Sequence, residues 1–294
     1  MLKISVVTPS YNQAKFVEEC LLSVKQQNYP WMEHIVVDGV STDGTLEILR
    51  QYSARKGWEH LRWTSEPDRG QSDALNKGFQ MAKGDVIGWL NSDDFYLPAC
   101  FETVARAYQQ NPQTDLLYGD FLWTDKEGVP FQVRREITFS RFALLHNHMC
   151  YVPSSGAMFF RSQIIRDGHR LDNSYHYAMD YEFFLRVAGA GYRFRHIPAL
   201  LSGLRLHSEC KSSAQAARMA MEHEKARREY LLGSFLCGTT WLTRVELAFM
   251  RLLAHGRRWG EKALRGYYFT QFRPGWVRKI QADPREAKPM LGAK

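Results

Sequence analysis

Residues 85–94 read DVIGWLNSDD, an apolar run followed at once by a polar tetrapeptide. The run at 86–90 lacks the alternation of a half-exposed strand and predicts a strand that is buried on both faces. Two adjacent carboxylates at a strand end repel each other, and a divalent cation bound by oxygen ligands removes that repulsion. A turn rich in Asn and Asp explains the same letters equally well, so residues 91–94 alone leave turn and metal site open.

Further apolar runs precede this stretch and alternate with segments of helical periodicity. Expected strands cover residues 4–8, ending at Pro9, then 34–38 and 61–64, and expected helices cover 16–24, 43–52 and 71–82. This alternation predicts an α/β fold with a parallel sheet covered on both faces. Ligands bind at the carboxyl ends of such strands. Polar residues gather there, at 9–12, at 38–39 and at 91–94.

The second half of the sequence has a different pattern. Short strands are expected at 116–119, 121–123, 129–133 and 157–160, with a turn at 125–128, and a helix is expected at 180–188. Residues 219–232 and 241–269 are helical in character, the latter interrupted at Gly256 and Gly260. A soft boundary near 212–214 separates a domain at 1–213 from a C-terminal extension at 214–294.

Basic residues are concentrated in that extension. The net charge is +8, and residues 215–294 contain 16 Lys and Arg against 7 Asp and Glu. One helical face carries Arg244, Arg251, Arg258, Lys262 and Arg265, beside an apolar arc. Such a helix suits the plane of an anionic membrane; a helix packed on its own domain with a solvated basic face is the equal alternative. Nucleic-acid binding is not expected, because no recognised module accompanies the charge.

The cysteines and the N-terminus indicate a compartment. Five scattered cysteines without a CxxC pair favour reduced thiols over a disulfide framework or a zinc cluster. Residues 1–3 lead directly into the first strand without a signal-peptide pattern, and 18 apolar residues never run together. We therefore expect a cytoplasmic protein, with or without peripheral contact to the inner face of the membrane through residues 241–269.

Taken in order, four motifs resemble family 2 glycosyltransferases: TPSYN at 8–12, VVDG at 36–39 followed by STDGT at 41–45, and NSDD at 91–94. EPDRGQSDALNKG at 66–78 is similar to a branch found in bacterial surface-polysaccharide synthesis. The resemblance covers residues 3–213. It implies a GT-A fold, in which a Rossmann-like nucleotide-binding sheet adjoins a smaller, mixed acceptor-side sheet. The basic C-terminal helices would extend this domain.

The resemblance also implies roles for the residues at the donor. Tyr11 would stack on the nucleotide base, Asp38 would accept hydrogen bonds from it, and Pro9 would shape the loop. The motif neighbours Asn12 and Gly39, with Asp73 and the weaker candidate Arg69, would complete the donor site. Asp93 would contact ribose or the donor sugar, and Asp94 would bind the Mg²⁺ or Mn²⁺ that bridges the two phosphates. Asn91 stands where the family usually has its first acid.

Residues further along the chain would serve the acceptor and the leaving group. Asp180 opens its helix as the family's general base does, although Met179 replaces the usual Glu; simple helix capping is the alternative. His207 would bind the metal or the phosphates, and Lys211 would neutralise the diphosphate. A zinc site at His146, His148, Cys150 and His176 is not favoured, because their spacing matches no known finger.

Together these inferences predict an inverting glycosyltransferase of the hexosyl or N-acetylhexosaminyl class. Its donor would be a nucleotide sugar, with UDP favoured, and its acceptor a hydroxyl of a glycan or lipid-linked glycan in cell-surface polysaccharide or glycolipid synthesis. A nucleotidyltransferase is one alternative, but it usually has a Gly-rich basic loop where residues 9–12 stand. A non-catalytic nucleotide-sugar-binding protein is another, and the presence of Asp94 and Asp180 argues against it.

Overall fold

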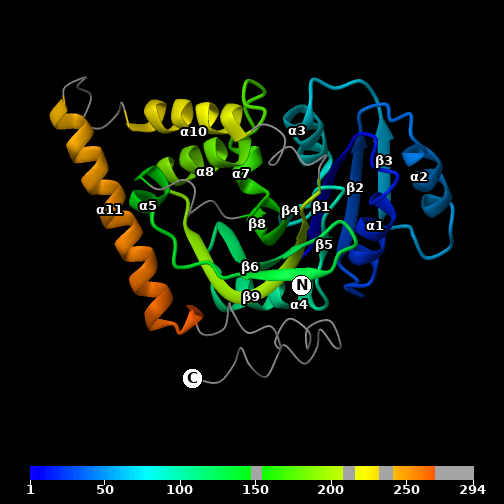
Figure 1. Cartoon of the computed structure of the whole chain (residues 1–294). Helices are drawn as coiled ribbons and strands as arrows, with labels where there is room; N and C mark the ends of the chain where they lie inside the picture. The colour runs from blue at the N-terminus through cyan, green and yellow to red at the C-terminus, as the bar shows by residue number, and fades with distance from the viewer. Residues whose placement is uncertain (147–153, 208–215, 232–240, 269–294) are drawn as a thin grey trace.

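The computed structural model describes residues 1–146, 154–207, 216–231 and 241–268 (Figure 1). The strands are β1 (Ile4–Ser10), β2 (Met32–Asp38), β3 (Leu61–Ser65), β4 (Val86–Trp89), β5 (Phe95–Tyr96), β6 (Leu116–Thr124), β7 (Pro130–Arg134), β8 (Met158–Arg161) and β9 (Phe194–Arg205). The helices are α1 (Val17–Lys25), α2 (Thr45–Ser53), α3 (Gln71–Met81), α4 (Cys100–Gln110), α5 (Arg141–His146), α7 (Gln163–Arg166), α8 (Met179–Gly189), α10 (Ala216–Leu231) and α11 (Trp241–Leu264).

The described strands form one mixed sheet in the order β3-β2-β1-β4-β8-β6-β9-β5, with β7 paired to β6. Strands β1 to β4 are parallel to their neighbours within the group, as the alternation of strands and helices predicted. Successive side chains of β1 are buried on opposite faces of the sheet: Val7 packs beside α3, and Val6 packs beside α1 and α4. Burying each such side chain stabilises the fold by about 1.5–3 kcal/mol.

Strand β1 runs two residues further than expected, through Pro9 to Ser10. The backbone O of Val7 accepts a hydrogen bond from the N–H of Leu90, so the backbone polar groups of Val7 point toward the side of β4. The backbone nitrogen of Pro9, two residues later, points to the same side. The pairing of β4 with β1 ends at Trp89. Proline therefore costs no ladder hydrogen bond at this position, and the prediction that Pro9 ends the strand was wrong.

Strand β6 joins two segments that were expected to be separate strands. Gly119 and Asp120 lie within it, and the pairing with β9 shifts register on either side of Asp120. A Cβ at Gly119 would approach the backbone O of Ala199 to 2.7 Å, so β9 crosses too closely for a side chain. The long strand β9 and the helix α4 carry no expectation from the sequence. Strand β8 runs antiparallel between β4 and β6.

Both C-terminal helices pack on the second half of the sheet domain (Figure 1). Ala226 of α10 and Ala254 of α11 are fully buried in the same apolar cluster as α8. The predicted interruptions of α11 at Gly256 and Gly260 are wrong, because the helix continues through both. An interior glycine costs a helix only about 1 kcal/mol, which the packing of α11 outweighs.

Both the membrane-bound helix and the helix packed on its own domain were expected to expose the basic face of α11, but part of that face is buried. Arg258 and Lys262 are buried, and Arg258 Nη2 lies 3.6 Å from Glu136 Oε2. Burial, reinforced by the charge of Arg258, lowers the pKa of Lys262 to about 8. The exposed side chains of α11 are instead largely apolar, namely Phe249, Leu252, Leu253, Trp259 and Leu264. Among the described helices, none is long and apolar enough to span a bilayer.

Candidate active site

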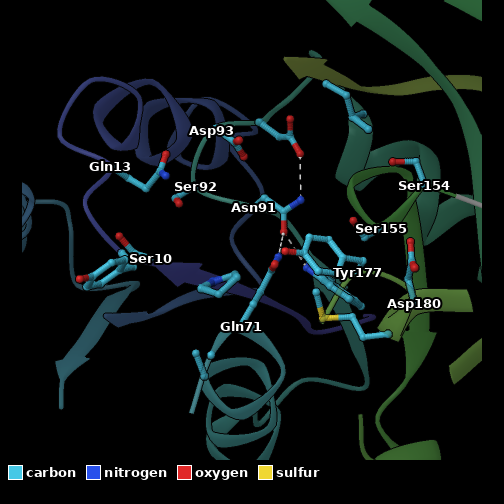
Figure 2. A pocket seen from close by; sticks show the side chains of 18 of the residues that line it. Ser10, Gln13, Gln71, Asn91, Ser92, Asp93, Ser154, Ser155, Tyr177 and Asp180 are labelled. Atoms are coloured by element: carbon cyan, nitrogen blue, oxygen red, sulfur yellow. Dashed lines mark hydrogen bonds between the residues drawn. The ribbon is translucent and has the colours of Figure 1, made fainter. Parts of the chain in front are cut away.

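A groove of about 1200 Å³ runs along the carboxyl ends of β1 and β4 and continues toward α8 and α10 (Figure 2). One end is lined by Pro9, Ser10, Tyr11, Gly39 and Val40, the centre by Asn91, Ser92, Asp93 and Asp94, and the other end by Arg134, Glu136, Ser154, Ser155, Tyr177, Asp180 and His223. Residues more than 200 positions apart in the sequence therefore share one cavity. Polar residues from the ends of β1 and β4 meet there, as expected, whereas the end of β2 contributes Gly39 and Val40.

Asn91 organises the centre of the groove. Its Oδ1 accepts hydrogen bonds from Gln71 Nε2 at 2.8 Å and from Trp89 Nε1 at 2.9 Å. Its Nδ2 donates to Asp94 Oδ2 at 3.2 Å, and Figure 2 shows these bonds as dashed lines. The amide thus orients the carboxylate of Asp94 by donating to it, whereas an ionised acid at this position could only accept and would add a negative charge beside Asp94.

The two adjacent acids have different surroundings. Asp94 is buried, and its Oδ1 accepts the backbone N–H of Arg205 at 3.0 Å. Asp93 Oδ2 lies 3.1 Å from His207 Nε2. Burial first, and then the negative charge of Asp93, raises the pKa of Asp94 well above its ordinary value. The structure therefore brings His207 to Asp93 and leaves Asp94 as a desolvated carboxyl facing the groove.

These acids fit a divalent cation that also binds phosphates. Among the described residues, no group of three or more His, Cys, Asp or Glu side chains forms a cage for a metal. Mg²⁺ is commonly held by one or two carboxylates together with substrate phosphates. A cation beside Asp94 would relieve the repulsion from Asp93 that raises its pKa. Asp94 and Asp93 are the residues that could hold it, with His207 bonded to Asp93.

The donor-side residues divide into those that line the groove and those behind it. Tyr11 lines it with 63% of its surface exposed, beside Pro9 and Gly39. Asp38 is fully buried, and its oxygens accept hydrogen bonds from Ser41 and Ser65. A base would compete with these protein donors, so the expected contact of Asp38 stays a prediction.

Asn12 also lies outside the groove wall. Its φ of 53° is in the left-handed region, and its Oδ1 accepts a hydrogen bond from the N–H of Thr42. The side chain that was expected to reach the donor therefore fastens the two strand-end loops together. Its neighbour Gln13, which the sequence did not single out, lines the groove instead.

At the start of α3, too, residues other than the expected ones line the groove. Arg69 is largely exposed and pairs with Asp73 at 3.1 Å, and neither residue lines the groove. Asp68 and Gln71 line it in their place. Helical spacing could have indicated Gln71. Gln71 and Ala74 are three positions apart, so they share a face of α3, and that face lines the groove. Asp73 lies on the outer side of that turn.

The acceptor-side acid is placed as expected, at the first turn of α8. Asp180 is partly buried in the groove wall, and its Oδ1 accepts the N–H of Tyr181 at 2.8 Å. Burial raises the pKa of Asp180, and the nearby charge of His223 opposes that rise. Figure 2 shows Asp180 on the opposite side of Asn91 from Ser10. A carboxyl with a raised pKa suits proton transfer near neutral pH.

The residues of the disfavoured zinc site are only partly described. His146 is buried on α5, whereas His176 is exposed at the groove. His148, Cys150 and Lys211 lie outside the described residues, so the expectation that Lys211 neutralises a diphosphate is not addressed by the structure.

Comparison with known proteins identifies the family. The sequence model described as "Glycosyl transferase family 2" matches residues 5–168, more than half of the chain. The chain belongs to glycosyl transferase family 2. Asp180 and His207 lie beyond the matched residues, so their placement comes from the structure.

The relatives place this family member among glycosyltransferases. It is 26% identical to chondroitin synthase of Escherichia coli over 236 residues, which are 78% of this chain and 32% of that synthase. The chain thus spans about a third of that relative's length.

Two solved structures share its fold. With S. aureus TarS 1–349 in complex with UDP-GlcNAc, the TM-score is 0.57 at 19% identity, covering 86% of this chain and 79% of that one. With the mannosyltransferase PcManGT of Pyrobaculum calidifontis in complex with GDP-Man and Mn²⁺, the TM-score is 0.57 at 17% identity, covering 86% and 80%. The α/β sheet with its curled mixed half is the expected GT-A fold.

Proposed function

We propose that this family 2 member is an inverting glycosyltransferase that moves a sugar from a nucleotide-sugar donor to an acceptor hydroxyl. The observation that carries the proposal is the pairing of two different acid sites in one groove. Asp93 and Asp94 form one site, and Asp180 stands apart from them on α8. Inversion requires this separation, because the leaving group and the attacking hydroxyl lie on opposite faces of the anomeric carbon.

The residues of the groove would divide the reaction between them. Asp180 accepts the proton of the acceptor hydroxyl while the hydroxyl oxygen forms the new bond to the anomeric carbon. The bond from that carbon to the diphosphate breaks at the same time, and the electron pair leaves with the nucleoside diphosphate. Bound near Asp94, Mg²⁺ or Mn²⁺ would stabilise the charge on the departing diphosphate. Tyr11, Pro9 and Gly39 would hold the nucleotide at the other end.

The relatives support the choice of substrates. A UDP-sugar is favoured because TarS was solved with UDP-GlcNAc, whereas the complex of PcManGT with GDP-Man and Mn²⁺ supports a divalent cation. Likeness to a chondroitin synthase supports a glycan or lipid-linked glycan as acceptor in surface-polysaccharide synthesis. The open acceptor end of the groove, with Trp123, Arg134 and Glu136, has the mixed apolar and polar lining that a sugar chain would use.

Nucleotide release from a panel of donors tests the proposal. With Mn²⁺ and glycan acceptors, we expect release of UDP, GDP or dTDP from one donor class. Asp180→Asn should lower kcat by about 10³-fold while donor affinity, measured by calorimetry, is retained. Release from no donor with any acceptor would favour the non-catalytic binding protein, and unchanged turnover in Asp180→Asn would refute the assignment of the base.

We further propose that α11 holds the protein against an anionic lipid surface on the cytoplasmic side. The apolar side chains of α11, which include Leu252, Leu253 and Trp259, face outward, and the exposed Arg251 and Arg257 flank them. Apolar burial with flanking cations is how helices bind in the plane of a membrane. Residues 214–294 would then be a membrane-contacting extension of a catalytic domain at 1–213.

A further inference from the structure

The start of α8, which carries Asp180, is held by a residue from another helix. A helix leaves its first backbone N–H groups without intrahelical partners, and Ala178, at the N-cap, makes no side-chain cap. The carboxylate of Glu222 on α10 accepts instead from the N–H groups of His176, Tyr177 and Ala178, at 2.7–3.1 Å. Such charge-assisted hydrogen bonds are roughly twice as strong as neutral ones.

Glu222 and Asp180 bond different parts of this turn. A carboxylate is favoured at a helix N-terminus by the macrodipole. Glu222 bonds the N–H groups of the residues that lead into α8, and Asp180 accepts the N–H of Tyr181 within the first turn. The carboxyl of Asp180 also lies among the residues that line the groove.

The segment just before α8 is fixed from both sides. Ser72 Oγ on α3 donates to the backbone O of Tyr175 at 3.2 Å, and Tyr175 Oη donates to Glu229 Oε2 on α10 at 2.7 Å. Lys225 Nζ lies 4.3 Å from the centre of the Tyr175 ring. The chain that leads into Asp180 is thus held by residues of both α3 and α10.

The residue after Glu222 faces Asp180 across the same groove. His223 lines the groove, is 7% exposed, and packs its ring 5.0 Å from that of Tyr181. Its Nδ1 lies 2.8 Å from the backbone O of Met219, which can only accept, so Nδ1 carries a proton. A positive charge there stabilises the carboxylate of Asp180.

We propose that Glu222 and His223 of α10 are positioning residues for the base of the transfer reaction. Glu222 anchors the backbone that presents Asp180, and His223 sets the charge beside its carboxyl. This inference rests on the proposed function, in which Asp180 takes the acceptor proton. It makes α10, beyond the residues that the family model matches, a part of the acceptor half of the active site.

Kinetics of Glu222 variants test the anchoring. Glu222→Ala should lower kcat about a hundredfold, because a displacement of about 1 Å at a reacting group costs that much. The KM for the donor should stay unchanged, since Tyr11 and Asp94 are untouched. Glu222→Gln, which keeps one accepting oxygen, should recover part of the loss. An equal fall in kcat and rise in donor KM, or no effect, would overturn the proposal.

The matched control is Arg228→Gln on the same helix. Arg228 is 74% exposed, pairs with Glu224 of α10 and lies outside the groove lining, so its loss should leave both constants unchanged. Thermal unfolding of each variant shows whether α10 stays folded. If Asp180→Asn is inactive while Glu222→Ala is fully active, the inference fails and the proposed function stands. If the unmodified protein turns over no donor, the proposed function itself fails.

The pH profile of His223→Gln tests the charge. The charged groups that line this end of the groove are Asp180, Arg134, Glu136, His176 and His223. Loss of the positive charge removes what opposes the rise in the pKa of Asp180. The acidic limb of kcat against pH should therefore move to higher pH. A purely structural role would lower kcat at every pH without moving the limb, and that result would contradict the proposal for His223.

Discussion

At the scale of single residues, the centre of the groove depends on how Asp94 is held. Asn91 and the backbone of Arg205 each donate to one of its oxygens, and its neighbour Asp93 raises its pKa. This pairing of desolvation with repulsion is destabilising in the free protein. A cation held there, as we propose, would offset it and favour binding of a metal–diphosphate complex.

Asp94→Asn should therefore lower kcat/KM by about 10³-fold, because the proposed metal would supply several kcal/mol to the transition state. Its amide retains the size of the side chain and removes one ligand charge. Titration of Mn²⁺ in the presence of the nucleotide, followed by electron paramagnetic resonance, should show weakened binding. Full activity at the same Mn²⁺ concentration would contradict a metal at Asp94.

Of the residues expected at the donor, the structure places Asp94 in the groove lining, whereas Asp38 and Asp73 lie outside it. Asp94 lies in the loop that follows β4, at the carboxyl edge of the sheet. Asp73 belonged to a motif, but a motif does not say which side of α3 faces the ligand. Gln71 faces it and bonds to Asn91. His223 was not predicted, since only the packing of α10 on α8 brings it there.

At the scale of elements, the N-terminal part of the sheet could be predicted, because each strand and helix there has its own hydrophobic periodicity and their alternation matches the observed parallel pairing. The second half could not. Strand β9 is long and includes Pro198, and it pairs in parallel with β6, so its pattern depends on a partner far away in sequence. Likewise, the basic stripe of α11 is visible in sequence, but the sequence does not show that Arg258 and Lys262 are buried, with Arg258 beside Glu136.

Lys262 on that inward side costs stability at neutral pH. Its pKa is about 8 in the folded protein against an ordinary value of 10.5. The unfolded chain therefore binds more protons between these values, and stability rises as pH increases from 8 to 10.5. Lys262→Met should raise the free energy of unfolding at pH 7 by about 1–3 kcal/mol. Thermal unfolding of both proteins at pH 7 and near pH 10 should show the difference shrinking at high pH; an undiminished difference would contradict the cause.

At the scale of the whole molecule, α11 stands on the opposite side from α2, against the acceptor half of the sheet (Figure 1). Helix α10 contacts both α11 and the start of α8, because Glu224 of α10 lies 3.9 Å from Arg251 of α11 and Glu222 accepts the N–H of Ala178. A surface that engages α11, as proposed, would be linked through these two contacts to the end of the groove where the acceptor would enter. That geometry suits an acceptor that is itself held at the surface.

Vesicle binding tests this arrangement. Replacing Leu252 and Leu253 by Glu removes two exposed apolar side chains, 66% and 47% accessible, without touching the buried contacts of Arg258 and Lys262. If each contributes about 1.5–3 kcal/mol on insertion, partition into anionic vesicles should fall at least a hundredfold. Trp31→Glu, at an exposed apolar residue just before β2 on the far side, is the matched control and should bind vesicles as the unmodified protein does.

If the unmodified protein does not bind vesicles but is a dimer that the Leu252 and Leu253 variant dissociates, the apolar face of α11 joins two copies of the chain instead. Because the double substitution lies far from the groove, its activity on a water-soluble acceptor should be unchanged, whereas activity on a vesicle-borne acceptor should fall with binding.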